Sequence, residues 1–441
     1  MELITKAPRG TQDVLPESSH EWQHVERTLL GIAQDYGFRE IRTPVFEHTE
    51  LFQRSVGETT DVVQKEMYTF EDKGKRSVTL KPEGTAGAAR AVLEHGLTGG
   101  ALPLKVAYVT PCYRYEKPQA GRLREFHQFG VECFGAGSPA ADAEVIALGD
   151  AILEAFHVPD VHLYINSIGC PECRAKYQEA LKAYFKSHES ELCETCVGRL
   201  DRNPMRILDC KSPVCSAIAK DAPIILDYLC DDCQKHFDGV QEFLKNAGIS
   251  FDIDPRIVRG LDYYTRTVFE FVCESDALGS QATVCGGGRY DGLLEELNGN
   301  AMPALGFGMG IERLLMTLKA SDYAFPEAKR CDVYLAPMGD AAAKECFSLV
   351  NALRSGGVYA ATDVVGRGLK AQMKYADKMG ARYTIVVGDN ELETGVANLK
   401  DMETGNVTEV RLFEDLYTVL YNLSLDREMS KISGLFDQVQ E

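Results

Sequence analysis

Residues 112–134 read CYRYEKPQAGRLREFHQFGVECF, two strand-like arms around a polar loop at Pro118–Gly121. This pattern predicts a β-hairpin. Because side chains alternate across a strand, one face of the two arms is expected to carry Arg114, Glu116, Arg122, Arg124, Phe126, Gln128 and Glu132. The residues between them make a mostly apolar face. The hairpin is therefore predicted to have one side for a core and one side for chemistry.

The polar face of this hairpin suits a nucleotide. Guanidinium groups bind phosphates, a phenylalanine ring stacks on a base, and carboxylates bind an amine or an imidazole. Charges on a strand face usually meet bulk water, but Phe126 and Gln128 among them favour ligand binding. The run Gly286–Gly288 lacks the spacing of a phosphate-binding P-loop, and no GxGxxG motif opens a helix after a strand. These two nucleotide-binding folds are therefore disfavoured.

Four further stretches lie outward from the hairpin along the chain: YGFREIRTPVFE (36–47), VRGLDYYTRTVFEF (258–271), GGGRYDGL (286–293) and ALGFGMGIERLL (304–315). Together with the hairpin they resemble the signature motifs of class II aminoacyl-tRNA synthetases, in the form typical of the histidyl-tRNA synthetase family. The second and third resemble the two histidine-specific segments of that family and are not generic. The resemblance covers nearly the whole chain.

The resemblance implies an α+β catalytic domain built on an antiparallel sheet of the class II synthetase type. Eight cysteines and helical spacing between residues 170 and 233 predict a small, mostly helical Cys-rich insertion. Short β runs then alternate with helices, which is typical of a small α/β domain, and this part resembles the class IIa anticodon-binding domain. The expected divisions are 1–168 and 251–325 for the catalytic domain, 169–250 for the insertion, 331–425 for the anticodon-binding domain and 426–441 for a C-terminal tail.

The resemblance also implies roles for individual residues. The expected catalytic residues are Arg114 and Arg259. ATP is expected to contact Arg114, Glu116, Arg122, Phe126 and Arg313. Histidine is expected to contact Glu83, Thr85, Gln128, Glu132, Arg259, Tyr263, Tyr264 and Tyr290. For tRNA the expected contacts are Gln119 and Arg367.

The local sequence leaves other interpretations open for some of these residues. Glu83 and Thr85 stand at an expected helix start, where capping is about as good an explanation as ligand binding. Arg313 at a helix start is electrostatically unfavourable, and stacking on adenine is the family's use of it. Charge such as that of Arg367 more often marks a solvated helix face.

The reaction implied by the resemblance is attack of the histidine carboxylate on the α-phosphorus of ATP, followed by transfer of histidine to tRNA(His). The carboxylate is ionised at neutral pH, so no general base is needed, and positioning and charge stabilisation dominate. Mg²⁺ is expected to accompany ATP. A homodimer is expected through the stretch 36–47, with Pro44 at the position that matches the family's interface motif.

Eight of the 14 cysteines form four close pairs: Cys170 and Cys173, Cys193 and Cys196, Cys210 and Cys215, Cys230 and Cys233. Such spacing indicates structural zinc, and two four-cysteine sites would use all eight thiols. No thioredoxin-like context supports a redox role, and reduced, unliganded thiols are the alternative. The metal would serve local stability and tRNA docking. Core positions are expected for Cys112, Cys133, Cys273, Cys285, Cys331 and Cys346.

Bulk properties place few limits on these predictions. The formal net charge of −19 argues mildly against a nucleic-acid partner, but positive residues gather at 114–124 and 366–378. The sequence has no apolar run long enough for a membrane helix and no secretory signal pattern at its start. A cytoplasmic protein without a membrane partner is therefore expected.

Two rival functions fit parts of the sequence. The regulatory paralogue of ATP phosphoribosyltransferase resembles the synthetase body, but it characteristically has a degenerate site and no anticodon domain. Here Arg114, Arg259, Arg313 and a C-terminal α/β domain are present. A noncatalytic RNA-binding or kinase-linked synthetase-like module is disfavoured because no appended domain is found.

Overall fold

A computed structural model of the chain describes residues 4–57, 60–119, 121–201, 203–208, 210, 212–257, 261–273 and 283–439. The chain divides into two compact units, Met1–Pro326 and Glu327–Glu441, here called the N-terminal and C-terminal units. None of the described helices is long and apolar enough to cross a membrane.

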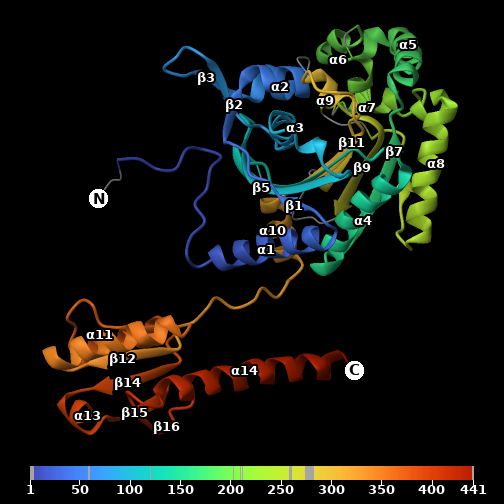
Figure 1. The fold of residues 1–441 in the computed structure, drawn as a ribbon. Coiled ribbons are helices and arrows are strands. Elements are labelled where there is room, and N and C mark those ends of the chain that lie inside the picture. Colours follow the sequence, from blue (N-terminus) through green and yellow to red (C-terminus); the bar gives the residue numbers. More distant parts are fainter. Residues whose placement is uncertain are drawn as a thin grey trace. The chain divides into compact units, whose positions relative to one another are not determined.

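An eight-stranded sheet forms the centre of the N-terminal unit (Figure 1). Its strand order is β1 (Arg39–Glu40), β5 (Leu104–Tyr113), β6 (Glu125–Phe134), β11 (Ala304–Gly310), β10 (Thr283–Arg289), β9 (Thr265–Cys273), β7 (Val161–Ser167) and β8 (Asp252–Ile253). The two edge pairs, β1 with β5 and β7 with β8, are parallel, and all the inner pairs are antiparallel. The predicted α+β class is confirmed.

The hairpin predicted at 112–134 is present, with longer strands and a longer connection than expected. β5 and β6 pair from Leu104 opposite Phe134 to Tyr113 opposite Glu125. The backbone N–H of Arg114 still donates to the carbonyl of Arg124 across the hairpin. The N–H of Tyr115 donates instead to the carbonyl of Glu66, outside the hairpin. The arms separate there because each finds a partner outside the hairpin. The predicted placement of Arg114, Glu116, Arg122 and Arg124 on strand faces is therefore wrong, since all four lie in the connection.

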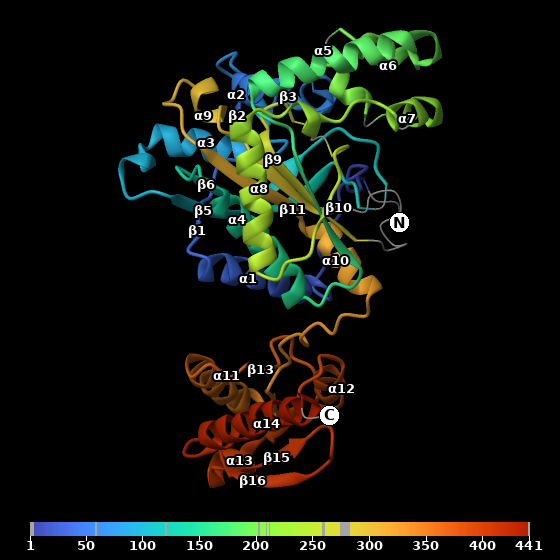
Figure 2. The same ribbon diagram turned by 90° about the vertical axis from the view of Figure 1, so that its right-hand side faces the viewer.

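Helices cover both faces of this sheet (Figure 2). One face packs on α1 (Ser19–Asp35), α4 (Pro139–Ala155), α8 (Asp231–Asn246) and α10 (Ile311–Ala320), with Leu29, Ile146, Phe237, Phe269 and Leu314 buried in the same core. Toward the other face lie α2 (Thr49–Val56), α3 (Thr85–Glu94), α9 (Leu293–Glu296) and a small sheet of β2 (Phe46–His48), β4 (Ser77–Leu80) and β3 (Tyr68–Glu71). Alternate residues of the same strands supply the two cores, as the period of a strand requires.

The Cys-rich insertion is mostly helical, as predicted. It contains α5 (Pro171–Ser187), α6 (Glu194–Arg199), α7 (Pro213–Ala219) and short 3₁₀ turns that include Pro204–Ile207. Tyr177, Leu181 and Phe185 bury one side of α5. Its last helix, α8, differs from the others because Phe237, Val240 and Leu244 join the core of the large sheet and its helices. Helix α8 runs beside α4 in both views (Figures 1 and 2).

A buried ion network also joins α8 to this body. Arg289, at the end of β10, donates from Nε to Asp142 of α4 at 3.2 Å and from Nη2 to the second oxygen of the same carboxylate. Nε2 of His236 in α8 lies 3.3 Å from Asp142 Oδ1. All three side chains are at most 5% exposed. Charges buried this deeply are stable in the fold when they are paired, so the three elements are held in one arrangement.

The C-terminal unit is a small α/β domain, as predicted. Its sheet has the order β13 (Ala360–Thr362), β12 (Val333–Pro337), β14 (Tyr383–Val387), β15 (Val396–Asp401) and β16 (Val407–Arg411). Its helices are α11 (Asp340–Ser355), α12 (Leu369–Lys378), α13 (Asp389–Thr394) and α14 (Leu416–Val439). Residues 426–439, which the sequence analysis set apart as a tail, continue α14. The unit has a core of its own around Val333, Leu353 and Ile385.

Candidate active site and thiolate clusters

A cavity of ≈ 660 Å³ opens between the hairpin connection, the central strands and the start of α10. All five residues predicted to bind ATP line it: Arg114, Glu116, Arg122, Phe126 and Arg313. They come from the connection, from β6 and from the first turn of α10, which are far apart in the sequence. The fold therefore brings together a set of residues that sequence reasoning had grouped through resemblance.

The guanidinium groups in this cavity are held by neighbouring backbone and side chains. Arg114 donates from Nε to the carbonyl of Pro82 at 2.8 Å, and its guanidinium lies 5.4 Å from the centre of the Phe126 ring. Arg313 donates to the carbonyls of Gly121 at 3.0 Å and Thr283 at 2.8 Å. Burial, and then the charge of Arg122, lower the pKa of Arg313. Arg114, Arg122 and Arg313 together offer several charge-assisted hydrogen-bond donors to an anion such as a polyphosphate.

Glu132 is fully buried in β6, the strand that also contributes Phe126 and Gln128 to the cavity. Its carboxylate accepts hydrogen bonds from the hydroxyl of Tyr108, at 2.8 Å, and from that of Tyr290. Burial raises the pKa of Glu132 to about 8 despite these donors. Three tyrosine rings pack together there, because the ring of Tyr263 lies 4.7 Å from that of Tyr264 and 5.4 Å from that of Tyr290. A buried carboxylate walled by phenols suits a small cationic or NH-bearing ring.

Glu83 caps a helix in this structure. Its carboxylate accepts from the backbone N–H groups of Thr85 at 2.7 Å and Ala86 at 2.8 Å, at the start of α3. The amide oxygen of Gln128 accepts from the N–H of Gly84 at 3.0 Å. Glu83 therefore has the helix-capping role that the local sequence allowed. Thr85 lies close enough to Glu132 for its hydroxyl to favour the charged form of that carboxylate.

Of the remaining predicted site residues, Gln119 and Arg367 do not line the cavity. Arg259 lies outside the described residues. Gln119 is exposed in the hairpin connection, where its backbone pairs with Arg122. Arg367 belongs to the C-terminal unit, where it donates to Asp363 at 2.7 Å and stacks 4.3 Å from the centre of the Tyr375 ring.

Sequence reasoning missed several residues around the cavity. Tyr108 looks like one more apolar strand residue, yet its hydroxyl reaches Glu132. Glu312 accepts from the backbone N–H of His127 at 2.8 Å and lies 3.0 Å from its Nδ1. The position of this carboxylate next to Arg313 in the sequence was a signal that could have identified it as a site residue. The cavity is also lined by Asp254, Arg256 and Glu270, for which no spacing pattern gave a signal. Carboxylates that could share Mg²⁺ with phosphate oxygens are therefore present in the lining.

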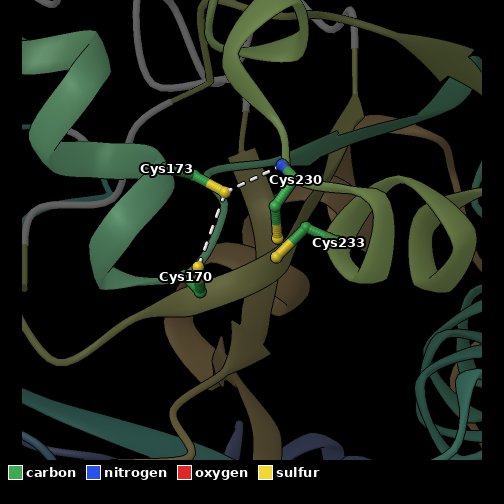
Figure 3. Close-up of side chains that lie close together, drawn as sticks. All are labelled: Cys170, Cys173, Cys230 and Cys233. Atoms are coloured by element: carbon green, nitrogen blue, oxygen red, sulfur yellow. Dashed lines mark hydrogen bonds between the residues drawn. The ribbon is translucent and has the colours of Figure 1, made fainter.

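The eight paired cysteines form two clusters, and in each cluster the ligand atoms lie within 4.8 Å of one another. The proximal cluster is Cys170, Cys173, Cys230 and Cys233, and the distal cluster is Cys193, Cys196, Cys210 and Cys215. Figure 3 shows the four proximal side chains pointing toward one another from the starts of α5 and α8. In chain order, the first and fourth cysteine pairs therefore form the proximal cluster, and the second and third pairs form the distal cluster.

The geometry of both clusters fits tetrahedral zinc. A Zn–S distance of about 2.3 Å places thiolates about 3.8 Å apart. The sulfurs of Cys170 and Cys173 are 3.5 Å apart, and those of Cys193 and Cys210 are 3.9 Å apart. Burial opposes ionisation of Cys170, but hydrogen bonds from Cys173 outweigh it and lower its pKa to about 7. Thiolate is the form that binds metal. The six remaining cysteines are buried, as predicted.

Proteins of known function are similar to this chain along most of its length. A family model for histidyl-tRNA synthetase matches residues 10–314, and one for an anticodon binding domain matches residues 332–421. A histidine–tRNA ligase of Clostridium novyi is 54% identical over 410 residues, which cover 93% of this chain and 97% of that protein.

Two solved structures extend the comparison. The crystal structure of apo S. aureus histidyl-tRNA synthetase has a TM-score of 0.81 at 40% identity and covers 95% of this chain and 100% of that one. An ATP phosphoribosyltransferase regulatory subunit/histidyl-tRNA synthetase from Bacillus halodurans C has a TM-score of 0.64 at 24% identity, with 88% of this chain and 99% of that one covered. The second likeness shows a shared fold alone.

Proposed function

Because the chain belongs to the histidyl-tRNA synthetase family, we propose that it activates L-histidine with ATP and transfers it to the 3′ end of tRNA(His). The observation that carries this proposal is the convergence of five predicted ATP-binding residues on one cavity, whose lining residue Gln128 lies in the same strand as the buried Glu132. The test is histidine-dependent exchange of pyrophosphate into ATP, followed by charging of purified tRNA. Exchange with another amino acid and none with histidine would contradict the proposal.

Activation of histidine is in this proposal an electrostatic and positioning reaction. Arg114 and Arg259 hold the α-phosphate while the histidine carboxylate attacks it and pyrophosphate leaves. Arg122 and Arg313 hold the outer phosphates or the adenine, and Phe126 stacks on the base. Glu116 supports this set through its ion pair with Arg122, 3.0 Å long. Mg²⁺, when bound with ATP, neutralises phosphate charge. The guanidinium groups of Arg114 and Arg313 are already fixed by backbone carbonyls, so little reorganisation of these two side chains is needed as charge develops.

Selection of histidine rests in this proposal on Glu132 and the three tyrosines beside it. Burial makes the Glu132 carboxylate costly to ionise, so a ring that donates an N–H hydrogen bond to it stabilises its charged form. Hydrogen-bonded selection rejects isosteres far better than shape alone. Tyr263, Tyr264 and Tyr290 wall the ring, while Gln128, Thr85 and Glu83 stand nearer the α-amino and carboxylate groups.

The regulatory-subunit alternative predicts a different result in the same test. Such a protein would not exchange pyrophosphate into ATP in the presence of histidine. The predicted ATP-binding residues, the two histidine-specific segments and the C-terminal α/β unit of this chain support the synthetase function instead.

Recognition of tRNA is assigned in this proposal to two separate places. The exposed Gln119 in the hairpin connection is proposed to lie near the acceptor end, and Arg367 is proposed to contact the anticodon through the C-terminal unit.

A homodimer is proposed through residues 36–47, and the cytoplasm is proposed as the location because charged tRNA is used there. A fully active monomer in sedimentation at micromolar concentration would contradict the dimer.

Structural zinc is proposed for both thiolate clusters, with one ion in each. The support is the four-sulfur arrangement of each cluster and its sulfur–sulfur distances. Reduced, anaerobically purified protein is expected to carry two zinc ions per chain by elemental analysis. Protein without zinc would refute this part of the proposal and leave the activation reaction standing.

A further inference from the structure

We propose that the proximal thiolate cluster, when it holds zinc, positions the histidine pocket, whereas the distal cluster mainly folds the outer part of the insertion. This inference rests on the proposed function and extends it to the two metal sites. From the sequence alone, the metal is expected to serve local stability and tRNA docking. The hydrogen bonds around the proximal cluster lead instead to the segment that carries Tyr263 and Tyr264.

The first connection runs through the backbone just before Cys170. The N–H of Ile168 donates to the carbonyl of Arg266 at 2.7 Å, and the N–H of Arg266 donates to the carbonyl of Gly169 at 2.9 Å. Arg266 has φ of 51°, a left-handed conformation that is costly for a residue with a side chain. The paired hydrogen bonds hold Arg266 in this conformation two residues after Tyr264.

The second connection is a side chain next to a ligand. Arg174, which follows Cys173, donates from Nη1 to the backbone carbonyl of Tyr264 at 3.0 Å. Tyr264 is 6% exposed and its ring lies 6.4 Å from that of Tyr290, which donates to Glu132. A shift of the α5 start would therefore move the backbone from which the pocket tyrosine projects.

The turn at Gly169, between these two connections, is tightly packed against the proximal cluster. Gly169 has φ of 67°, and a Cβ placed there would lie 2.5 Å from Cβ of Cys173. The N–H of Cys230 donates to the sulfur of Cys173 at 3.1 Å, so the start of α8 meets the same point. Metal in this cluster joins the starts of two helices and the strained turn into one rigid corner. Without metal, these hydrogen bonds and packing contacts alone hold the corner, and it is expected to be less rigid.

The distal cluster is linked to the same segment less directly. Arg206, four residues before Cys210, lies 3.4 Å from a carboxylate oxygen of Asp262, and Asp262 remains 32% exposed. Such a partly solvated pair is worth little compared with buried backbone hydrogen bonds. Loss of the distal metal is therefore expected to disturb the histidine pocket much less than loss of the proximal metal.

A matched pair of variants separates the two clusters. Cys170 and Cys193 each open a CxxC pair, each occupy the N-cap position of a helix without a side-chain cap hydrogen bond, and each are half-buried. Serine is favoured at an N-cap position, so Cys170→Ser and Cys193→Ser differ mainly in which metal is lost. Zinc content would be measured by elemental analysis, histidine affinity by calorimetry, and the KM values for histidine and ATP by pyrophosphate exchange.

Both variants are expected to retain one zinc ion in place of two. Cys170→Ser is expected to weaken histidine binding roughly tenfold or more, the effect of losing one charge-assisted hydrogen bond, with the KM for ATP within about twofold. Cys193→Ser is expected to change histidine affinity less than about threefold. The proposal is overturned if Cys170→Ser loses one zinc ion and binds histidine like the unaltered protein, or if both variants weaken it equally.

Arg174→Ala tests the same connection without touching a ligand. It is expected to retain both zinc ions and to weaken histidine binding several-fold, and Arg174→Lys is expected to recover part of the loss. Unchanged histidine affinity in Arg174→Ala would exclude this route even if Cys170→Ser failed to fold. If the unaltered protein carries zinc but shows no histidine-dependent exchange, the proposed function fails and the zinc content still reports on the clusters.

Discussion

At the scale of single residues, Glu132 has the most unusual environment in the site. Its carboxylate is fully buried between two phenol hydroxyls, and burial raises its pKa from 4.5 to about 8. Between pH 4.5 and about 8, Glu132 of the folded, ligand-free protein therefore keeps a proton that the unfolded chain has released. Because the folded state binds more protons there, the free energy of unfolding falls as the pH rises from 4.5 to about 8.

Glu132→Gln is expected to remove this contribution to the pH dependence of stability. Without histidine, the variant and the unaltered protein should be similarly stable near pH 4.5, and the variant should gain by up to about 1.4 kcal/mol per pH unit above it. Urea unfolding of the N-terminal unit across this range measures the difference. Parallel pH profiles for the two proteins would contradict it. Histidine-dependent exchange should be lost in the variant at every pH.

Arg114→Ala is expected to slow activation of histidine by about a hundredfold in kcat, or roughly 3 kcal/mol in the barrier, because the guanidinium stabilises charge on the attacked phosphate. Arg124→Ala is the matched control, since Arg124 lies in the same connection and packs 3.9 Å from the centre of the Tyr115 ring. The control should change kcat by less than about fivefold. Weaker binding of substrate with kcat unchanged in Arg114→Ala would make it a binding residue only.

At the scale of elements, the sequence predicted those parts that carry a long, regular pattern. The strands β5 and β6 are ten residues long, and their predicted pairing as a hairpin is confirmed. The edge strands β1 and β8 have two residues each, too few for any period. Tyr108 was missed because its role depends on register, since it lies opposite Gly130, where a Cβ would overlap its ring.

The cysteine pairs illustrate the same limit. Their spacing predicts metal binding, but it does not say which pairs meet, because that depends on how α5 and α8 are placed. Helix α8 packs on α4 beside the large sheet, and this brings its first turn to the end of β7, where Cys170 follows. The nested pairing is therefore a property of tertiary packing.

Removal of zinc by a strong chelator is expected to lower the helical content of the insertion and to weaken tRNA charging. At saturating histidine and ATP, pyrophosphate exchange should remain above about half of its starting rate, because no cysteine of either cluster lines the cavity. Circular dichroism and the two assays on one preparation measure this. Loss of exchange at saturating histidine, restored by added zinc, would show that the insertion supports the catalytic residues themselves.

At the scale of the whole molecule, the chain has two units with separate cores. The N-terminal unit contains the cavity and both thiolate clusters, and the C-terminal unit contains a five-stranded sheet of its own and Arg367, in the connection between β13 and α12. Each unit buries enough apolar surface to have its own core. Activation and recognition of tRNA are therefore expected to be separable by truncation.

A chain ending at Pro326 is expected to keep histidine-dependent exchange within about tenfold of the full chain and to lose most of its charging of tRNA(His). The physical reason is that every described residue of the cavity belongs to the N-terminal unit. A matched variant, Arg367→Ala in the full chain, should lower charging and leave exchange unchanged. Charging that survives the truncation would show that the C-terminal unit is not needed for tRNA recognition.

The ion network of Asp142, Arg289 and His236 has a consequence for recombination between related genes. An exchange of the segment 169–250 as a cassette would replace His236 together with Phe237, Val240 and Leu244, although these side chains complete the core under the large sheet. Asp142 and Arg289 would remain in the recipient as a buried pair with one neighbour missing. A transferable insertion therefore has to end before Cys230, so that the recipient keeps its own α8 with its N-cap residue, and the two thiols of Cys230 and Cys233 are then inherited from the recipient rather than the donor.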